Sequence, residues 1–295
     1  TGEDWEGFMK QRPDLKYKAS LSIGSLPAGR LDKPALPFKD IRVRQAMNLA
    51  VNKKEILDNY YKGRGALFAV PVPPGPSHAK MFTPLEEQPS QPTIPGSRAS
   101  VQELFTYNPE KAKQLLKEAG YPNGFKTEFV VSPTGIDLAS ILKDQLSKVG
   151  IELVLKLLDS ATYQNTDNQR TFPEMILGGW YDYSFPNTML PYTNTYGNSN
   201  YWNYDNSDER TNKAFAIVGT AVGFDDELWQ RTLKEYYPYV LEQAIRIWLP
   251  GYYTYVMWQP WVKNYYGSTP GGYYEPLGFT RFLWYDSELK KSMGY

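Results

Sequence analysis

The stretch DIRVRQAMNLAVNKKEILDNYYKG, residues 40–63, predicts two short helices joined at an asparagine. Asp40 is placed to cap the first helix, because its carboxylate can accept a hydrogen bond from a free N–H of the first turn. Asn52 and Glu55 have the spacing of a capping box for the second helix, in which each side chain binds the backbone N–H of the other residue. The first helix should bury one apolar face, formed by Val43, Ala46, Met47, Ala50 and Val51.

A third helix is predicted downstream, in the segment YNPEKAKQLLKEAGYPNG, residues 107–124. Asn108 is its expected N-cap, Pro109 suits the first turn, and Gly120 ends it. The alternating residues that follow, 125–131, predict a strand.

A strand–helix–strand unit is completed by a helix at 136–149 and a strand at 151–159. The second strand is rich in β-branched residues and leucine, which is typical of a strand covered on both faces. We therefore expect a parallel strand pair and an α/β fold. The rest of the chain predicts a strand at 174–180, two helices between 207 and 243, and a β-rich tail from residue 245.

Composition excludes several classes of function. The chain has 295 residues, no cysteine and a single histidine, His78, so it has almost no material for a catalytic triad, a thiolate site or a multi-histidine metal site. Lys and Arg total 32 and balance 32 Asp and Glu, which leaves no basic field for nucleic acid. We therefore predict no enzyme activity, cofactor, metal or nucleic acid partner.

Two other features of the sequence bear on function. Aromatic residues make up 15% of the sequence, a density that favours the walls of a ligand cleft. A long loop rich in Pro, Gly and Ser spans residues 66–102, and either surface cover or a functional loop would explain it, with surface cover slightly favoured.

Five motifs resemble a known family when they are taken in order. They are PFKDIRVRQAMNLAVNKKEIL, YNPEKAKQLLKEAGYPNGFKTEF, LASILKDQLSKVGIELVL, GGWYDYSFPNTML and YGNSNYWNYDNSDERTNKAF, and together they cover most of residues 30–250. They resemble the family 5 extracellular solute-binding proteins, the dipeptide, oligopeptide and nickel type receptors of ABC importers. The single histidine disfavours nickel.

The resemblance implies a type II periplasmic-binding-protein-like fold, with βαβ units on a mixed sheet and mainly the second of two lobes present. Residues 1–34 would be a crossover segment from a first lobe that is missing, 35–250 the second lobe, and 251–295 a return segment that packs on the first lobe. The start of the chain lacks the features of a signal peptide, so we expect it to begin after any targeting segment or inside a longer protein.

The resemblance also implies a ligand site. The family motif W-x-x-D-Y-x-D-P is similar to the run Trp180, Tyr181, Asp182, Tyr183, with altered spacing and with the second aspartate replaced. Asp182 would pair with a ligand ammonium group, as in several peptide-binding members. A loop cap or a surface ion pair is the competing interpretation of this aspartate.

Three further residues are candidate ligand contacts. Tyr201 and Trp202 lie in a loop that edges the cleft in relatives, although aromatic residues also anchor loops onto a core. Arg170 could bind a ligand carboxylate through its fork of N–H donors, but an ordinary solvated arginine is the simpler interpretation.

The predicted function is the substrate-binding component of an ABC importer, which captures an oligopeptide or dipeptide by closure of two lobes. An oligosaccharide receptor of the same family is the first alternative, and a glycoside-active enzyme or carbohydrate-binding module comes after it. The expected location is periplasmic or extracellular, next to the membrane through the ABC permease or a lipid anchor outside this chain. The chain taken alone should also self-associate, because its aromatic tail would lack its usual cover.

Overall fold

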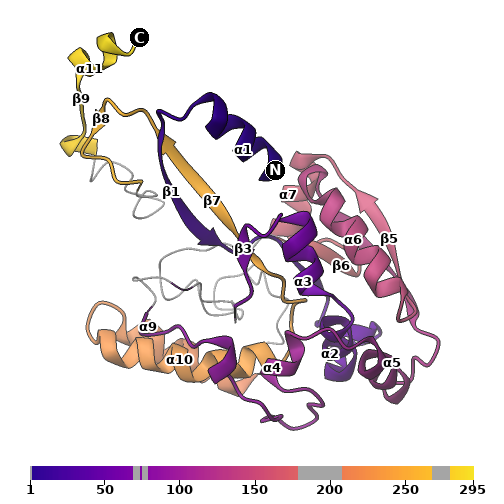
Figure 1. Cartoon of the computed structure of the whole chain (residues 1–295). Helices are drawn as coiled ribbons and strands as arrows, with labels where there is room; N and C mark the ends of the chain where they lie inside the picture. Colours follow the sequence, from indigo (N-terminus) through magenta and orange to yellow (C-terminus); the bar gives the residue numbers. More distant parts are fainter. Residues whose placement is uncertain (1, 69–73, 75–78, 179–207, 268–279) are drawn as a thin grey trace.

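The computed structural model describes residues 2–68, 74, 79–178, 208–267 and 280–295 (Figure 1). Within these residues the strands form three sheets, with the orders β2-β6-β4-β5, β1-β7-β3 and β8-β9. The strands are β1 (Lys16–Ser22), β2 (Leu26–Gly29), β3 (Gly65–Ala66), β4 (Phe125–Val131), β5 (Ile151–Leu157), β6 (Met175–Gly178), β7 (Gly251–Trp258), β8 (Val262–Lys263) and β9 (Trp284–Tyr285). The predicted α/β class is confirmed.

The helices of the described residues occur along the whole chain, from α1 to α11. They are α1 (Gly2–Gln11), α2 (Ile41–Leu49), α3 (Lys53–Glu55), α4 (Val101–Leu104), α5 (Pro109–Glu118), α6 (Ile136–Ser147), α7 (Ser160–Asn168), α9 (Glu209–Ala221), α10 (Asp226–Glu242) and α11 (Ser287–Ser292). Single turns of other helix types occur at η1 (Pro37–Lys39), η2 (Ile56–Tyr60), η4 (Leu85–Glu87), η5 (Pro133–Gly135) and η7 (Thr280–Phe282).

The parallel pair predicted from the sequence is β4 with β5, joined by α6. Their register runs from Phe125 opposite Ile151 to Val131 opposite Leu157. β4 also pairs in parallel with β6, whereas β2 closes the sheet in the antiparallel direction, so the sheet is mixed. Gly124 lies at φ +75°, and a Cβ there would come within 1.9 Å of the Gly150 carbonyl oxygen, so this turn requires glycine.

The prediction that β5 is covered on both faces is wrong. Ile151 and Leu153 are buried, but the alternate residues Glu152 and Val154 are exposed. β5 lies at the edge of the sheet, and the alternation of buried and exposed residues shows that only one of its faces packs against the core. Edge position depends on strand pairing elsewhere in the chain, which the composition of β5 does not report.

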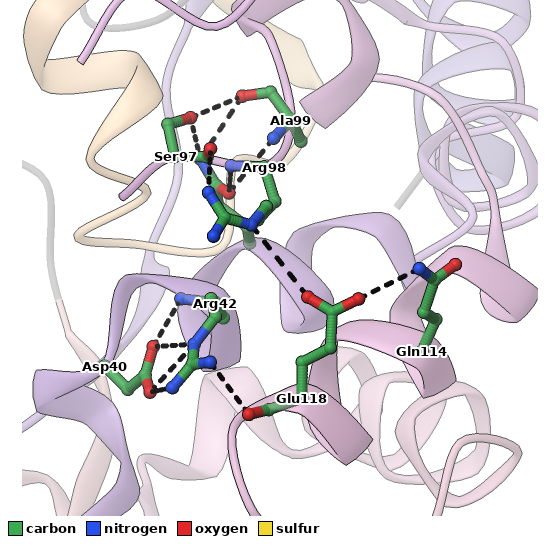
Figure 2. A network of polar contacts seen from close by, with 8 residues as sticks. Asp40, Arg42, Ser97, Arg98, Ala99, Gln114 and Glu118 are labelled. Atoms are coloured by element: carbon green, nitrogen blue, oxygen red, sulfur yellow. Dashed lines mark hydrogen bonds and ion pairs between the residues drawn. The ribbon is translucent and has the colours of Figure 1, made fainter. Parts of the chain in front are cut away.

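The predicted start of α2 is confirmed. The Asp40 carboxylate accepts a hydrogen bond from the Arg42 backbone N–H at 2.8 Å, and the same carboxylate forms an ion pair with the Arg42 guanidinium. Figure 2 shows that Arg42 then reaches the end of α5, where its Nη1 donates to the Glu118 carbonyl oxygen at 2.8 Å. The cap of α2 therefore also fixes α5 against it.

The capping box of the next helix is only half present. The Asn52 side chain accepts from the Glu55 N–H at 3.1 Å, as predicted. The return bond from Glu55 is absent, because the Asn52 N–H donates instead to the side-chain oxygen of Gln145 at 2.9 Å. Gln145 lies on α6, so this junction is tied to the strand–helix–strand unit.

The loop before α4 is held by buried polar side chains. Glu242, at the end of α10, is fully buried and accepts from the backbone N–H groups of Thr93 and Ile94. Gln45, also fully buried, accepts from the N–H groups of Arg98 and Ala99. This part of the predicted loop region is thus fastened to the core by specific bonds.

The chain segments near the two ends of the sequence lie side by side. β1 pairs antiparallel with β7 over its full length, from Lys16 opposite Trp258 to Ser22 opposite Tyr252. Figure 1 shows α1 running alongside this pair, which extends away from the helices of the four-stranded sheet. β3 continues the sheet on the other side of β7, so β7 is its central strand.

Candidate ligand-binding site

A cavity of about 760 Å³ lies where the two larger sheets approach each other. Its lining comes from α1, β7, η2 with the turn that follows, η5 with the first turn of α6, and Leu177 near the end of β6. The turn after β4 and the last residues of β6 both contribute, so the cavity lies at the carboxyl ends of two parallel strands. This is where open α/β sheets commonly bind ligands.

Stacked aromatic rings form two parts of the cavity wall. The rings of Tyr61 and Tyr252 stack with centroids 5.2 Å apart and an interplanar angle of 16°. Trp5 and Tyr255 stack at 3.8 Å and 18°. Such faces provide large apolar contact area at low entropy cost. Burial raises the pKa of the Tyr61 hydroxyl, so this side of the cavity stays uncharged at neutral pH.

Two side chains of opposite charge also line the cavity. Arg64 follows η2, and only 20% of its side chain is exposed. Its Nη2 forms an ion pair with Glu6 of α1, whereas its Nη1 is buried and has no hydrogen-bond partner among the described residues. Asp137, in the first turn of α6, is exposed, and its charge is one of the causes, after burial, that raise the pKa of Tyr60.

Six of the seven candidate residues from the sequence lie outside the described residues: Trp180, Tyr181, Asp182, Tyr183, Tyr201 and Trp202. The position of the first four along the chain is nevertheless informative. β6 ends at Gly178, two residues before Trp180, and Leu177 lines the cavity. The strand that precedes the motif therefore ends at this cavity.

The seventh candidate, Arg170, forms a different set of contacts. Its Nη2 lies 3.7 Å from an Asp32 carboxylate oxygen, and its side chain is 19% exposed. Burial lowers the pKa of this guanidinium, and the charge of Asp32 acts in the opposite direction. Arg170 is not among the described residues that line the aromatic cavity.

Sequence reasoning did not single out Arg64, Asp137, Tyr61 or Tyr252. Two patterns in the sequence could have indicated this wall: the aromatic pair at 60–61 and the run GYYTYVMW of β7. Because alternate side chains of a strand share a face, this run could have predicted a strand with an aromatic face. Nothing local marks Arg64, because its role depends on α1 and β7, which are distant in sequence.

A second cavity, of about 640 Å³, lies beside α9 and α10. Charges of both signs line it, including Lys39, Arg210, Asp208 and Glu209. It has none of the stacked aromatic walls of the first cavity and lies away from the ends of β4 and β6. We therefore take the aromatic cavity as the candidate site.

The residues that the structure describes contain no group of three or more His, Cys, Asp or Glu side chains arranged to hold a metal ion. None of their helices is both long and apolar enough to cross a bilayer.

Comparisons with known proteins agree with the fold and the motifs. Residues 15–201 match the family of bacterial extracellular solute-binding proteins, family 5 Middle. Heme-binding protein A of Haemophilus influenzae is 30% identical over 250 residues, which cover 80% of this chain and 41% of that protein. Glutathione-binding protein GsiB of Escherichia coli K12 is 28% identical over 151 residues, or 49% of this chain and 26% of that protein.

Solved structures share the fold at lower identity. The ABC transporter-associated periplasmic binding protein DppA of Helicobacter pylori, in complex with the peptide STSA, superposes with a TM-score of 0.70 at 20% identity, and the match covers 97% of this chain and 52% of DppA. The oligopeptide-binding protein AppA of Bacillus subtilis, in complex with a nonapeptide, gives a TM-score of 0.68 at 19% identity over 96% of this chain and 55% of AppA.

The fold is therefore that of the type II periplasmic binding proteins, as the motifs implied. The chain spans about half the length of these structures and less than half of the two curated relatives. From the family match over residues 15–201, together with the fold and the order of the motifs, we conclude that this chain belongs to the family 5 bacterial extracellular solute-binding proteins.

Proposed function

We propose that the chain is the second-lobe portion of the substrate-binding component of an ABC importer, and that the complete receptor captures a short peptide, a dipeptide or an oligopeptide, outside the membrane. Family membership and the likeness to peptide complexes of DppA and AppA support this proposal. The receptor would bind its ligand without chemistry, by closure of two lobes around it.

The observation that carries the proposal is the aromatic cavity at the ends of β4 and β6. Its volume, about 760 Å³, lies in the range of small-molecule sites. Apolar walls suit peptide side chains, and the two charges, Arg64 and Asp137, suit a ligand that has charged ends. β6 leads from this cavity directly into the motif that contains Asp182.

Within this proposal the motif residues keep the roles that the resemblance implies. Asp182 would pair with the ligand ammonium group, and the neighbouring aromatic residues would contact its apolar parts, as would Tyr201 and Trp202. A carboxylate is well suited to this role, because a charged hydrogen bond is strengthened where water is excluded.

The proposed domain division follows from the same receptor architecture. Residues 35–250 would form the second lobe, and the segments 1–34 and 251–295 would connect it to the first lobe. The antiparallel pairing of β1 with β7 supports this division, because it brings the two segments together as one ribbon. The partner of the closed receptor would be an ABC permease, and the location would be periplasmic or extracellular.

Two other ligands are consistent with parts of the site. Aromatic walls also stack on sugar faces, which favours an oligosaccharide. The likeness to heme-binding protein A adds a flat, hydrophobic anion as a second competitor. A peptide is preferred over both, because of the three ligands only a peptide has an ammonium group and a carboxylate that could pair with Asp137 and Arg64 in the same cavity.

The test is to identify the ligand of the full-length receptor. The receptor is purified without denaturation and then denatured to release any ligand that co-purified with it. Mass spectrometry of the released material should detect peptides. Calorimetry should then show binding of a mixed pool of two- to five-residue peptides but not of maltotriose or hemin. Tyr252→Ala should weaken peptide binding about tenfold through loss of the stacked wall, and Tyr107→Ala, outside the cavity, should have no effect. Recovery of sugar or hemin alone would disprove the peptide assignment.

A further inference from the structure

Two chain segments cross between the two larger sheets. The first joins β1 to β2, and its residues Gly24 and Ser25 line the candidate cavity. The second runs from the end of α10 into β7 and contains Arg246. The crossings are tied together at the four-stranded sheet, where the Ile247 N–H donates to the Pro27 carbonyl oxygen at 3.0 Å. They are tied again where β1 pairs with β7, so they lie side by side between the sheets.

Arg246 reaches from the second crossing to the first. Its side chain is buried, and its Nη1 donates to the carbonyl oxygen of Leu26, the first residue of β2, at 2.8 Å. Its own carbonyl oxygen accepts from the Asn48 side chain, which fixes its backbone to α2. Burial lowers the pKa of Arg246 to about 10, and the charge of the buried Asp167 on α7 opposes that change. The guanidinium is therefore charged at neutral pH.

The same guanidinium lies against the last residue of β6. This residue, Gly178, is opposite Leu26 in the antiparallel pairing of β6 with β2. A Cβ at position 178 would lie 2.8 Å from Nη1 of Arg246, closer than side chains normally approach each other. Its next neighbours, Asp167 Oδ1 at 3.4 Å and Ile176 Cγ2 at 3.5 Å, would be at ordinary contact distances. The glycine thus makes room in the strand for the guanidinium.

The residues that Arg246 holds are next to residues that line the cavity. Leu177, which precedes Gly178, is a lining residue, and the lining residues of the first crossing directly precede Leu26. Arg246 is not among the described lining residues. It lies behind two walls of the cavity and joins them where they meet. A binding site depends on such support, because small displacements of its walls weaken its contacts.

We propose that Arg246 is a positioning residue for ligand binding, which holds the end of β6 and the start of β2 at the spacing that shapes the candidate cavity. It acts through Gly178 and Leu26 and does not touch the ligand. This inference rests on the proposed peptide-binding function. It adds to that function a residue behind the cavity on which the affinity depends.

The experiment measures the apparent affinity of the full-length receptor for the mixed pool of two- to five-residue peptides by calorimetry. Gly178→Ala places a methyl group against Nη1, so it should weaken binding about tenfold by displacing the guanidinium. Arg246→Met removes the guanidinium and should weaken binding by a similar factor. In the double variant the methyl group no longer meets Nη1. Adding Gly178→Ala to Arg246→Met should therefore weaken binding less than about twofold further.

Two control variants separate positioning from general stability. Gly219→Ala, on α9, adds a methyl group with no neighbour within 4 Å and should leave binding unchanged. Arg44→Met removes another buried arginine, which donates to the carbonyl oxygens of Phe38 and Gln243 and lies outside the aromatic cavity. It should lower the midpoint of urea denaturation, as Arg246→Met does, but the folded receptor should keep its affinity for the peptides.

The variants also define the results that would overturn this role. Equal affinities of the wild type, Gly178→Ala and Arg246→Met would overturn it and leave peptide binding intact. A loss for Gly178→Ala that persists undiminished in the Arg246→Met background, or an equal loss in Arg44→Met, would do the same. If Arg246→Met does not fold, the comparison of Gly178→Ala with Gly219→Ala decides. Failure of the wild type to bind any peptide would instead overturn the proposed function and, with it, this inference.

Discussion

Asn48 on α2 accepts a hydrogen bond from the backbone N–H of Trp248 at 2.8 Å, although the two residues are 200 positions apart in the sequence. The same amide donates to the Arg246 carbonyl oxygen at 2.8 Å. Asn48 and Trp248 are both fully buried. The Asn48 side chain thus joins α2 to the segment that leads into β7.

Asn48→Leu should therefore destabilise the protein strongly. The leucine has a similar volume but removes the hydrogen bonds that the asparagine makes to a buried N–H and a buried carbonyl oxygen, at a cost of about 3 kcal/mol in the free energy of unfolding. Urea denaturation measures this change. Asn165→Ala, at an exposed position of α7, should change stability by less than about 0.5 kcal/mol. Equal effects of the two variants would show that the Asn48 bonds contribute little.

Glu242→Gln should loosen the loop before α4. The glutamate accepts from Thr93 and Ile94 with both carboxylate oxygens, and an amide replaces one acceptor with a donor. Trypsin cleavage after the nearby Arg98 should become about tenfold faster as the loop opens more often. Glu235→Gln, an exposed residue on the same helix, should leave the cleavage rate unchanged.

Lys53 should make stability depend on pH in the alkaline range. It is almost completely buried, its ammonium donates to the Asn48 carbonyl oxygen at 2.6 Å, and burial lowers its pKa to about 7 from 10.5. Between those two values the unfolded chain binds a proton that the folded chain does not. The free energy of unfolding should therefore rise with pH from about 7 to about 10, by an amount on the order of 4 kcal/mol.

The measurement for Lys53 is the difference from a matched variant. Wild type and Lys53→Met should diverge in urea denaturation as the pH rises above 7, and their difference should be constant below 7, where both states carry the proton. Lys54→Met, at a neighbouring exposed lysine, should follow the wild type at every pH. Parallel curves for wild type and Lys53→Met would show that the buried lysine has an ordinary pKa.

The chain on its own should self-associate through its aromatic tail. Phe282, Trp284 and Tyr285 are 58%, 52% and 71% exposed and lie close together in sequence around β9. Trp284→Lys should shift the sedimentation of the isolated chain toward the monomer. Phe224→Lys, at a single aromatic residue that is 94% exposed between α9 and α10, should not do so. A wild-type chain that sediments as a monomer at high concentration would contradict the expectation.

The local signals in the sequence were reliable where the partner is also local. The caps at Asp40 and Asn108 form as predicted, because each side chain binds an N–H two or three residues away. Glu55 failed as a cap because Gln145, 90 positions from it, takes the N–H that it was expected to bind. The exposed face of β5 and the role of Arg64 follow from strand order and from α1, which no local pattern encodes.

The candidate ligand site also combines features that are local in the sequence with features that are not. The strand before the ligand motif was predicted from the sequence, and β6 does end at the candidate cavity. The other walls could not be predicted, because they come from α1, η2 and β7, which are brought together only by the pairing of distant strands. Arg170 was a reasonable candidate by residue type, but Asp32 is its partner in the folded chain.

The pairing of β1 with β7 has a consequence for the order in which the chain folds. Ser22 and Tyr252 are opposite each other but more than 200 residues apart, so this ribbon closes a loop that contains most of the chain. Closing such a loop is entropically costly and slow, whereas β4, α6 and β5 need only contacts within a few tens of residues. The strand–helix–strand unit should therefore gain amide protection early in refolding, and the ribbon that carries the cavity's aromatic wall should gain it last. Binding competence would then appear only at the end of folding.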